Sequence, residues 1–185
     1  MGLKLVMSPR SRRALLAAVC LASLNSSAYA NDDAGVNALY ERLSEAVLTD
    51  DTAKVASLYR PDSIYLGPGA SPIVGSEAIS TPFTKAWKMM RGDGATVSLQ
   101  VRLAQRIWHG KNSATDVGFS KFSFVFDDKS KAPKIFYDKW VTLVEKRSDG
   151  TWAFRVDTNN GVTTKTAAAD YSALKPVGNL KYDPE

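Results

Sequence analysis

The feature that most constrains the fold of this 185-residue chain is a change in its hydrophobic period at Gly94. Before Gly94, apolar residues recur at helical spacing, which is typical of amphipathic helices. After it, apolar and polar residues alternate along long segments separated by turn residues, which is typical of strands with one buried face. The change predicts an α+β domain in which helices pack on one face of a curved antiparallel sheet.

Three helices are predicted before the long strands. The first covers about residues 34–48, and the second is a short helix that Pro61 ends. A short strand pair around Gly67–Gly69 separates it from the third helix, which begins near Ser76. Pro82 falls inside this third helix and removes an internal hydrogen bond, so we expect a break or kink there.

The strand region carries two further predictions. Apolar residues up to Phe119 alternate in one phase and those from Phe122 in the other, so we expect a bulge near residues 120–121 that bends the sheet. Residues 163–185 are polar and weakly patterned, which predicts a polar C-terminal tail or a loosely docked extension.

Three motifs follow one another between residues 34 and 161. They are Leu58–Tyr59 with Asp62, the block 72–79, and Asp149–Trp152 followed by Asp157 and Asn159. Their order and spacing resemble the nuclear-transport-factor-2-like superfamily, in particular its SnoaL-like and ketosteroid-isomerase-like branch. The resemblance implies a cone-shaped, curved antiparallel sheet covered by three N-terminal helices, with a pocket in the cone and a homodimer formed through the open sheet face. It implies no single activity, because this fold hosts isomerases, cyclases, dehydratases, binding modules and assembly domains.

The resemblance also bears on the best-known chemistry of this branch. In its steroid isomerases, a general-base aspartate lies just before a proline in the loop after the first short strand. The matching position here is Gly67, before Pro68, and glycine cannot accept a proton. Steroid isomerisation by the family mechanism is therefore not expected.

Asp138 is the candidate catalytic residue. It lies within one residue of the position that the resemblance assigns to the family's partner acid, and it alternates with Phe136 and Trp140 on one strand face. If that face lines the cone, the aromatic surroundings raise the pKa of Asp138, as suits an acid or base. The alternative is an aspartate on the outer, solvated face or one paired with Lys or Arg.

Aromatic and amide side chains supply the expected ligand contacts. The candidate ligand-binding residues are Tyr40, Tyr65, Trp87, Trp140 and Asn159. Asp157 alternates out of phase with the apolar residues of the last strand, so we interpret it as the partner of Arg102 or Arg106 in a cross-strand ion pair.

Cys20 is the only cysteine and His109 the only histidine, so we expect no metal site and no cofactor.

Residues 1–30 have the features of a bacterial export signal. A basic start is followed by an apolar run that is too short to span a bilayer and by small residues at Ala28 and Ala30. The adjacent Arg12 and Arg13 fit a twin-arginine signal and equally an ordinary secretory signal, so both routes stay open. We expect a cone domain at residues 31–162 after this signal, and a periplasmic or secreted location.

The charge balance follows from this signal, because all four of its charged residues are basic. Without them, 20 basic residues face 19 acidic ones, so the mature chain is nearly neutral and no nucleic-acid partner is expected. We also expect no stable membrane insertion once the signal is removed. The sequence therefore predicts an exported protein that binds a small apolar or aromatic ligand in the cone, and it is compatible with a cofactor-free isomerase, lyase or hydrolase. The alternative is a non-catalytic module that dimerises or sequesters a ligand.

Overall fold

The computed structural model describes residues 33–92, 94–163 and 165–178. The chain divides into residues 1–34 and residues 35–185, and the second unit includes residues 35–162 of the predicted domain. The predicted signal peptide, residues 1–30, lies outside the described residues. In the described part of the chain, no helix is both long enough and apolar enough to cross a bilayer.

Among the described residues, three helices precede the long strands, as the spacing of the apolar residues predicted. They are residues 33–49, α2 (Thr52–Leu58) and α3 (Ser76–Gly92). The Asp51 side chain caps α2 by accepting a hydrogen bond from the backbone N–H of Lys54 at 2.8 Å. Leu39, Val55 and Ile79 bury the apolar side of each helix in the common core.

The predicted break at Pro82 is wrong, because α3 runs without interruption from Ser76 to Gly92. Ile79 before the proline and Trp87 after it are both buried in the core, and Phe83 packs against the same core. Burial of these side chains keeps both halves in one helix, although proline deprives the carbonyl of Ala78 of its usual donor.

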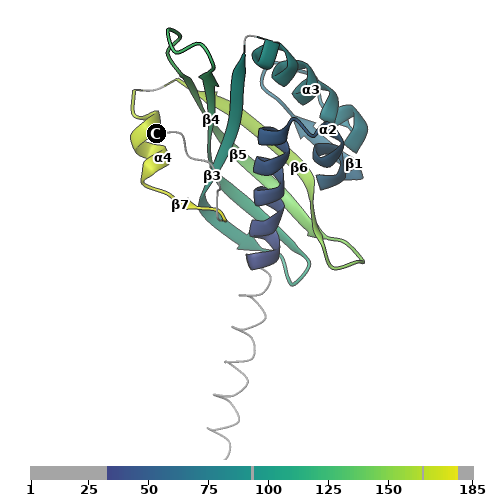
Figure 1. Ribbon diagram of the computed structural model, residues 1–185. Coiled ribbons are helices and arrows are strands. Elements are labelled where there is room, and N and C mark those ends of the chain that lie inside the picture. Colours follow the sequence, from purple (N-terminus) through teal and green to yellow (C-terminus); the bar gives the residue numbers. More distant parts are fainter. Residues whose placement is uncertain (1–32, 93, 164, 179–185) are drawn as a thin grey trace, which may run out of the picture. The chain divides into compact units, whose positions relative to one another are not determined.

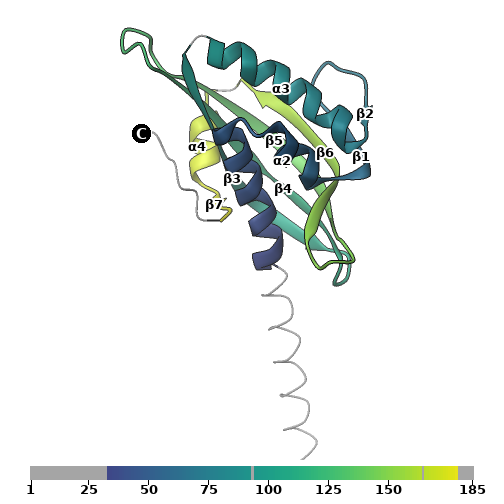
Figure 2. The same ribbon diagram turned by 45° about the vertical axis from the view of Figure 1, so that its right-hand side comes forward.

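Within the described ranges, seven strands form one open, curved sheet in the order β2-β1-β6-β5-β4-β3-β7. They are β1 (Tyr59–Leu66), β2 (Ile73–Val74), β3 (Ala95–Trp108), β4 (Ser113–Phe126), β5 (Lys134–Lys146), β6 (Trp152–Val162) and β7 (Lys175–Pro176). Neighbouring strands are antiparallel except β1 and β6, which run parallel. The long strands β3 to β6 form a bent layer with the first three helices along one face (Figure 1, Figure 2). This is the cone-shaped arrangement that the sequence predicted.

The bulges lie elsewhere than predicted. Strand β4 keeps its register through residues 120–121, so Phe119 and Phe122 point to opposite faces of the sheet. The register shifts instead in β3, between Leu103 and Gln105, and between β5 and β6, where Arg155 is the extra residue. The apolar residues of β4 up to Phe119 therefore lie on one face of the sheet and those from Phe122 on the other, so the strand needs no extra residue.

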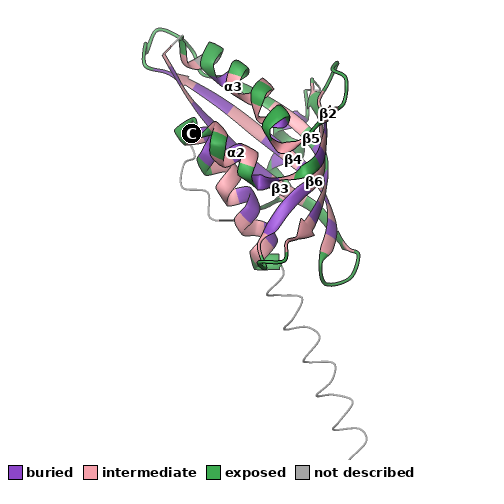
Figure 3. Ribbon diagram, turned by 90° about the vertical axis from the view of Figure 1, so that its right-hand side faces the viewer, coloured by how far each residue is buried: buried purple, intermediate pink, exposed green. Residues whose placement is uncertain are grey.

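The face of the sheet under the helices is the main core of the domain. Phe154, Trp152 and Val97 are almost fully buried there. Figure 3 shows buried residues where the helices meet the long strands and exposed residues in the connecting turns. We call this the concave face of the sheet.

The C-terminal residues are more ordered than the predicted polar tail. Residues Ala167–Ser172 form the short helix α4, and β7 pairs with β3 at the edge of the sheet. Tyr171 is buried, donates a hydrogen bond to the side-chain oxygen of Gln100 at 3.2 Å and packs on Tyr137 from β5. Because these residues alternate out of phase with those of the concave face, α4 covers part of the other, outer face. The sequence left a tail and a loosely docked extension open, and the described residues 165–178 are docked on the sheet.

Candidate active site

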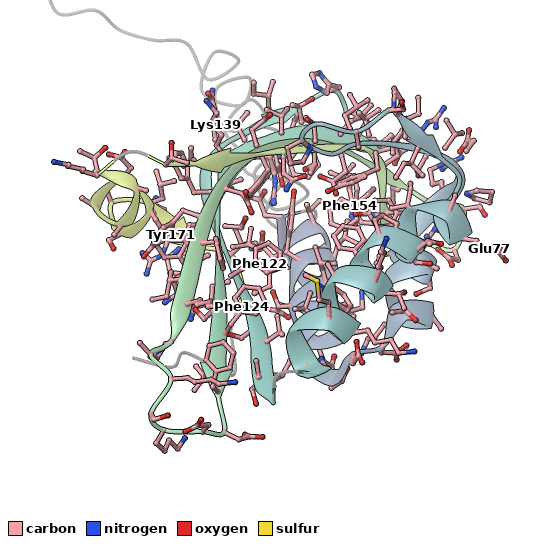
Figure 4. All side chains as sticks on the ribbon, turned by 90° about the horizontal axis from the view of Figure 1, so that it is seen from above. Glu77, Phe122, Phe124, Lys139, Phe154 and Tyr171 are labelled. Carbon is pink, nitrogen blue, oxygen red and sulfur yellow. The ribbon has the colours of Figure 1, made fainter. Side chains whose placement is uncertain are left out.

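A cavity with a volume of about 60 Å³ lies between the concave face and the helices. We call it the inner cavity. Its walls are mostly aromatic and aliphatic, and its polar lining comes from Tyr40, Tyr59, Tyr65, Ser120, Thr142, Asp157 and Asn159. Figure 4 shows two of its lining residues, Phe122 and Phe154, inside the space between sheet and helices, whereas Lys139 points away on the other side of the sheet.

A bulge in β6 places Asp157 in this cavity. Phe154 lies on the concave face, and simple alternation would send Asp157, three residues later, to the outer face. Arg155 is the extra residue of the bulge, so Asp157 returns to the face that Phe154 occupies and stands opposite Thr142 of β5. Our interpretation of Asp157 as an ion-pair partner of Arg102 or Arg106 is therefore wrong.

The Asp157 carboxylate is held by one hydrogen bond. The Tyr59 hydroxyl donates to it at 2.6 Å, and no cation forms an ion pair with it within the described residues. Burial raises the pKa of Asp157 to about 6, although the hydrogen bond from Tyr59 acts in the opposite direction. The side chain is deep in the protein and still partly accessible, because it lines a cavity that water can enter.

A second polar pair lies beside Asp157. The Tyr40 and Thr142 hydroxyls are 2.6 Å apart in a fully buried hydrogen bond. Burial, reinforced by the nearby Asp116 carboxylate, holds the pKa of Tyr40 well above its usual value. The Tyr40 hydroxyl therefore remains protonated at neutral pH.

Arg106 and Asp116 form a buried ion pair at the end of this network. Arg106 Nε and the terminal nitrogen each donate to one carboxylate oxygen of Asp116 at 2.8 Å. Asp116 has no exposed surface, and Arg106 also donates to Asn37 of the first helix at 3.1 Å. Because Arg106 neutralises Asp116, the charge of Asp116 does not dominate the cavity.

These side chains form one row across the sheet. Arg106, Asp116, Thr142, Asp157 and Tyr65 occupy directly paired positions on β3, β4, β5, β6 and β1. Paired positions on adjacent strands point to the same face of a sheet. A polar row thus crosses an otherwise apolar concave face. Of the two acids in this row, Asp157 has no cationic partner in the part of the chain that the structure describes.

Four of the five predicted ligand-binding residues line the inner cavity. These are Tyr40, Tyr65, Trp140 and Asn159. The Tyr65 hydroxyl donates to the side-chain oxygen of Asn159 at 2.8 Å, and burial raises the pKa of Tyr65. Trp87 lies away from the cavity wall, buried in the core with its ring 5.7 Å from that of Phe83.

The predicted catalytic residue, Asp138, lies beside the inner cavity without lining it. It is on the concave face, one same-face position beyond Trp140, and is half-buried. Burial raises the pKa of Asp138, and its carboxylate in turn helps to raise the pKa of Tyr65. Gly67, the position of the missing steroid-isomerase base, packs against the Tyr65 ring.

The sequence indicated neither Asp157 nor its partners as site residues. Tyr59 and Asp157 belong to the quoted motifs, but alternation assigned Asp157 to the wrong face. Thr142 carries no signal of its own, because threonine is frequent on strands.

No family model matches the sequence, and no curated protein matches it significantly. Solved structures do match. A nuclear-transport-factor-2-like protein with a cystatin-like fold from Novosphingobium aromaticivorans is 16% identical, with a TM-score of 0.64 over 81% of this chain and 93% of that chain. A type 2 hexachlorocyclohexane dehydrochlorinase is 12% identical, with a TM-score of 0.60 over 86% of this chain and 97% of that one. A ketosteroid isomerase-like protein from Erwinia carotovora atroseptica is 13% identical, with a TM-score of 0.52 over 69% and 93%.

At these identities the likeness shows the fold. The domain has the cystatin-like cone fold of nuclear-transport-factor-2-like proteins, as the motifs predicted. Ligand binding and catalysis are both found among proteins with this fold, so the activity has to be argued from the cavity itself.

Proposed function

We propose that this domain binds a small, largely apolar molecule in the inner cavity and removes a proton from it with Asp157. The reaction class is a cofactor-free isomerisation or elimination. The observation that carries the proposal is a cavity-lining carboxylate without a cationic partner within the described residues, hydrogen-bonded by Tyr59 at 2.6 Å.

The environment of Asp157 suits a general base. With a pKa of about 6, its carboxylate is mostly ionised at neutral pH and still basic enough to accept a proton from a weak acid. The apolar walls lower the local dielectric constant, which strengthens electrostatic interactions within the cavity. The Tyr59 hydrogen bond fixes the orientation of the carboxylate, so that its other oxygen is available to the ligand.

Asp157 replaces Asp138 as our leading candidate for the base. Both carboxyls are on the concave face, but only Asp157 lines the inner cavity. A base must lie within hydrogen-bonding reach of the proton that it removes.

Hydrogen–deuterium exchange of nitroethane tests this proposal. Nitroethane is a carbon acid small enough to probe a narrow cavity: its C–H proton passes to Asp157, the electron pair moves onto the nitro group, and a deuteron from solvent returns to carbon. In D₂O, the protein should accelerate loss of the methylene ¹H signal, and Asp157→Asn should lower the protein-dependent rate about 100-fold. Asp127→Asn, at an exposed position, is the matched control and should keep the full rate. Equal rates for the Asp157 variant and the parent would refute the proposal.

The small volume of the cavity favours a second candidate, the non-catalytic module. Typical ligand pockets measure roughly 300–1,000 Å³, whereas about 60 Å³ is open here because the protein's own aromatic side chains fill the cone. A module that only dimerises or sequesters a ligand would show no acceleration of nitroethane exchange at any pH between 5 and 9.

We further propose that the protein is exported to the periplasm or secreted. The proposal rests on the basic start, the short apolar run and the small residues of positions 1–30. Fractionation of bacterial cells expressing the full chain should give a shortened, extracytoplasmic form. Replacing Arg12 and Arg13 together by Lys should block export by the twin-arginine route and leave an ordinary secretory route working, which separates the two.

A further inference from the structure

Strand β1 places two tyrosines against two neighbouring side chains of β6. Tyr59 donates a hydrogen bond to the Asp157 carboxylate at 2.6 Å, and Tyr65 donates one to the side-chain oxygen of Asn159 at 2.8 Å. Asp157 and Asn159 are two residues apart on the concave face, and both line the inner cavity. The candidate base therefore has an amide beside it that a second tyrosine holds.

The Asn159 side chain has donors that the protein itself does not use. An asparagine carries one acceptor oxygen and an NH₂ group with two N–H donors. The Tyr65 hydroxyl occupies the oxygen, whereas the NH₂ group makes no hydrogen bond with any described residue. Because the side chain is partly accessible and lines the inner cavity, a ligand in the cavity can accept from it.

Tyr65 is held in position to orient this amide. Burial raises the pKa of Tyr65, so its hydroxyl stays protonated and continues to donate at neutral pH. Its ring packs on that of Phe83 from α3, with 5.4 Å between the ring centroids. A Cβ at Gly67 would stand 2.8 Å from Cε1 of Tyr65. The glycine at the position of the steroid-isomerase base therefore leaves room for the ring that orients Asn159.

We propose that the Asn159 amide donates a hydrogen bond to an oxygen of the ligand while Asp157 removes a proton from the neighbouring carbon, and that Tyr65 positions the amide. Same-face neighbours on a strand are roughly 7 Å apart and a hydrogen bond takes up about 3 Å at each end, so the two groups contact ligand atoms only a bond or two apart. This inference rests on the proposed function of Asp157 and deepens it.

The ligand class is therefore a small aldehyde, ketone or nitroalkane with an acidic C–H next to the activating group. The C–H bond breaks, its proton passes to the Asp157 carboxylate, and its electron pair moves onto the oxygen that accepts from Asn159. Return of the proton to the same carbon completes an exchange, and its return to another carbon completes an isomerisation. A haloalkane without such an oxygen lies outside this class.

Nitroethane exchange in D₂O tests the role of the amide. Asn159→Leu removes both donors and should lower the protein-dependent rate about 100-fold at every pH above the midpoint of the profile. Asn160→Leu, at the exposed neighbouring position, is the matched control and should keep the full rate. An unchanged rate in Asn159→Leu would overturn the inference. Recovery of the full rate at higher pH would also overturn it, because Asn159 would then only adjust the pKa of the base.

Tyr65→Phe tests the positioning role. The variant should lower the exchange rate about 10-fold in the parent protein, because the amide loses the hydrogen bond that orients it. It should have no further effect in Asn159→Leu, since the tyrosine acts through the amide. Equal losses in the two backgrounds would overturn this role of Tyr65.

A binding measurement separates the inference from the proposed base. Asp157→Asn lacks the carboxylate and keeps Asn159, so the ¹⁵N-labelled side-chain amide of Asn159 should shift when nitroethane is added to this variant. If that amide does not respond, the inference is wrong whether or not the parent protein exchanges nitroethane. If the amide responds and the parent protein exchanges no nitroethane, the contact with Asn159 stands and the proposed base fails.

Discussion

The buried Asp157 carboxylate, which we propose as the base of the site, lowers the stability of the folded protein at neutral pH. Its carboxyl is buried beside apolar walls, and the single hydrogen bond from Tyr59 compensates only part of the lost hydration. The folded-state pKa of about 6 lies above the ordinary value of 3.8, so the folded protein binds the proton more tightly than the unfolded chain. The stability that this protonation provides is present below about pH 4 and is lost as the pH rises through 6.

We therefore expect Asp157→Asn to stabilise the protein at neutral pH while lowering the rate of proton transfer about 100-fold. The gain in the free energy of unfolding should be about 1–3 kcal/mol at pH 7.5, because the amide remains neutral and can still accept the Tyr59 hydrogen bond. It should vanish near pH 4, where the native carboxyl is already protonated in the folded state. Urea unfolding at both pH values measures the difference, with Asp127→Asn as control. A destabilised variant at pH 7.5 would contradict this account of the buried charge.

Gly118 provides a second prediction on this scale, because the indole of Trp140 lies over it. The two residues are directly paired on β4 and β5, and a Cβ on Gly118 would overlap the Trp140 ring, including Cε2 at 2.9 Å, and the backbone oxygen of Arg102. Gly118→Ala should destabilise the protein by about 2–3 kcal/mol in thermal or urea unfolding.

Gly92 is the matched control for this substitution. A Cβ there meets no atom within 4 Å, and the residue ends α3. Gly92→Ala should be neutral or stabilising by up to about 1 kcal/mol. If both variants lose the same stability, the close contact with Trp140 is not the cause.

At the scale of helices and strands, the sequence predicted the periodic elements well and the local exceptions poorly. Helical spacing before Gly94 and alternation after it were sufficient for the three helices and four long strands. The continuous α3 was missed because burial of Ile79 and Trp87 outweighs the local effect of Pro82. Local pattern cannot show such tertiary compensation.

The candidate site was predictable only in part, for a related reason. Tyr40, Tyr65, Trp140 and Asn159 were found because aromatic residues and a motif asparagine are visible in a sequence. Asp157 was assigned to the wrong face because a bulge at Arg155 changes the phase of β6 and leaves no signature in residue type. Bulges depend on the partner strand, which a single segment does not contain.

The docked C-terminal element leads to a prediction at this scale. Tyr171 anchors α4 on the outer face through its contact with Tyr137 and its hydrogen bond to Gln100. Tyr171→Ala should lower the free energy of unfolding by about 3–4 kcal/mol, because a large buried ring is replaced by a cavity. Tyr171→Phe keeps the ring and should cost only about 1 kcal/mol for the lost hydrogen bond. Equal effects in urea unfolding would show that α4 is not held by this ring.

For the whole molecule, we propose that the outer face of the sheet forms a homodimer. Val141 and Ile135 are 41% and 49% exposed on that face, next to the part that α4 covers. Apolar residues on an open sheet face are typical of an association surface. Val141→Glu should convert a dimer into a monomer in size-exclusion chromatography with light scattering. Met89→Glu changes a 66% exposed residue of α3 and is the control that should leave the mass unchanged.

The bulge at Arg155 has a consequence for how such a site could arise or disappear. The extra residue, Arg155, reverses the face of the sheet on which each later residue of β6 lies. Deleting that residue would move Asp157 to the solvent side and leave the composition of the strand nearly intact. Insertions and deletions of single residues in β6, more than substitutions, therefore determine whether a protein of this shape carries a buried acid or an inert apolar wall. A comparison of relatives should count the residues between the Gly150 turn and this aspartate before it compares their identities.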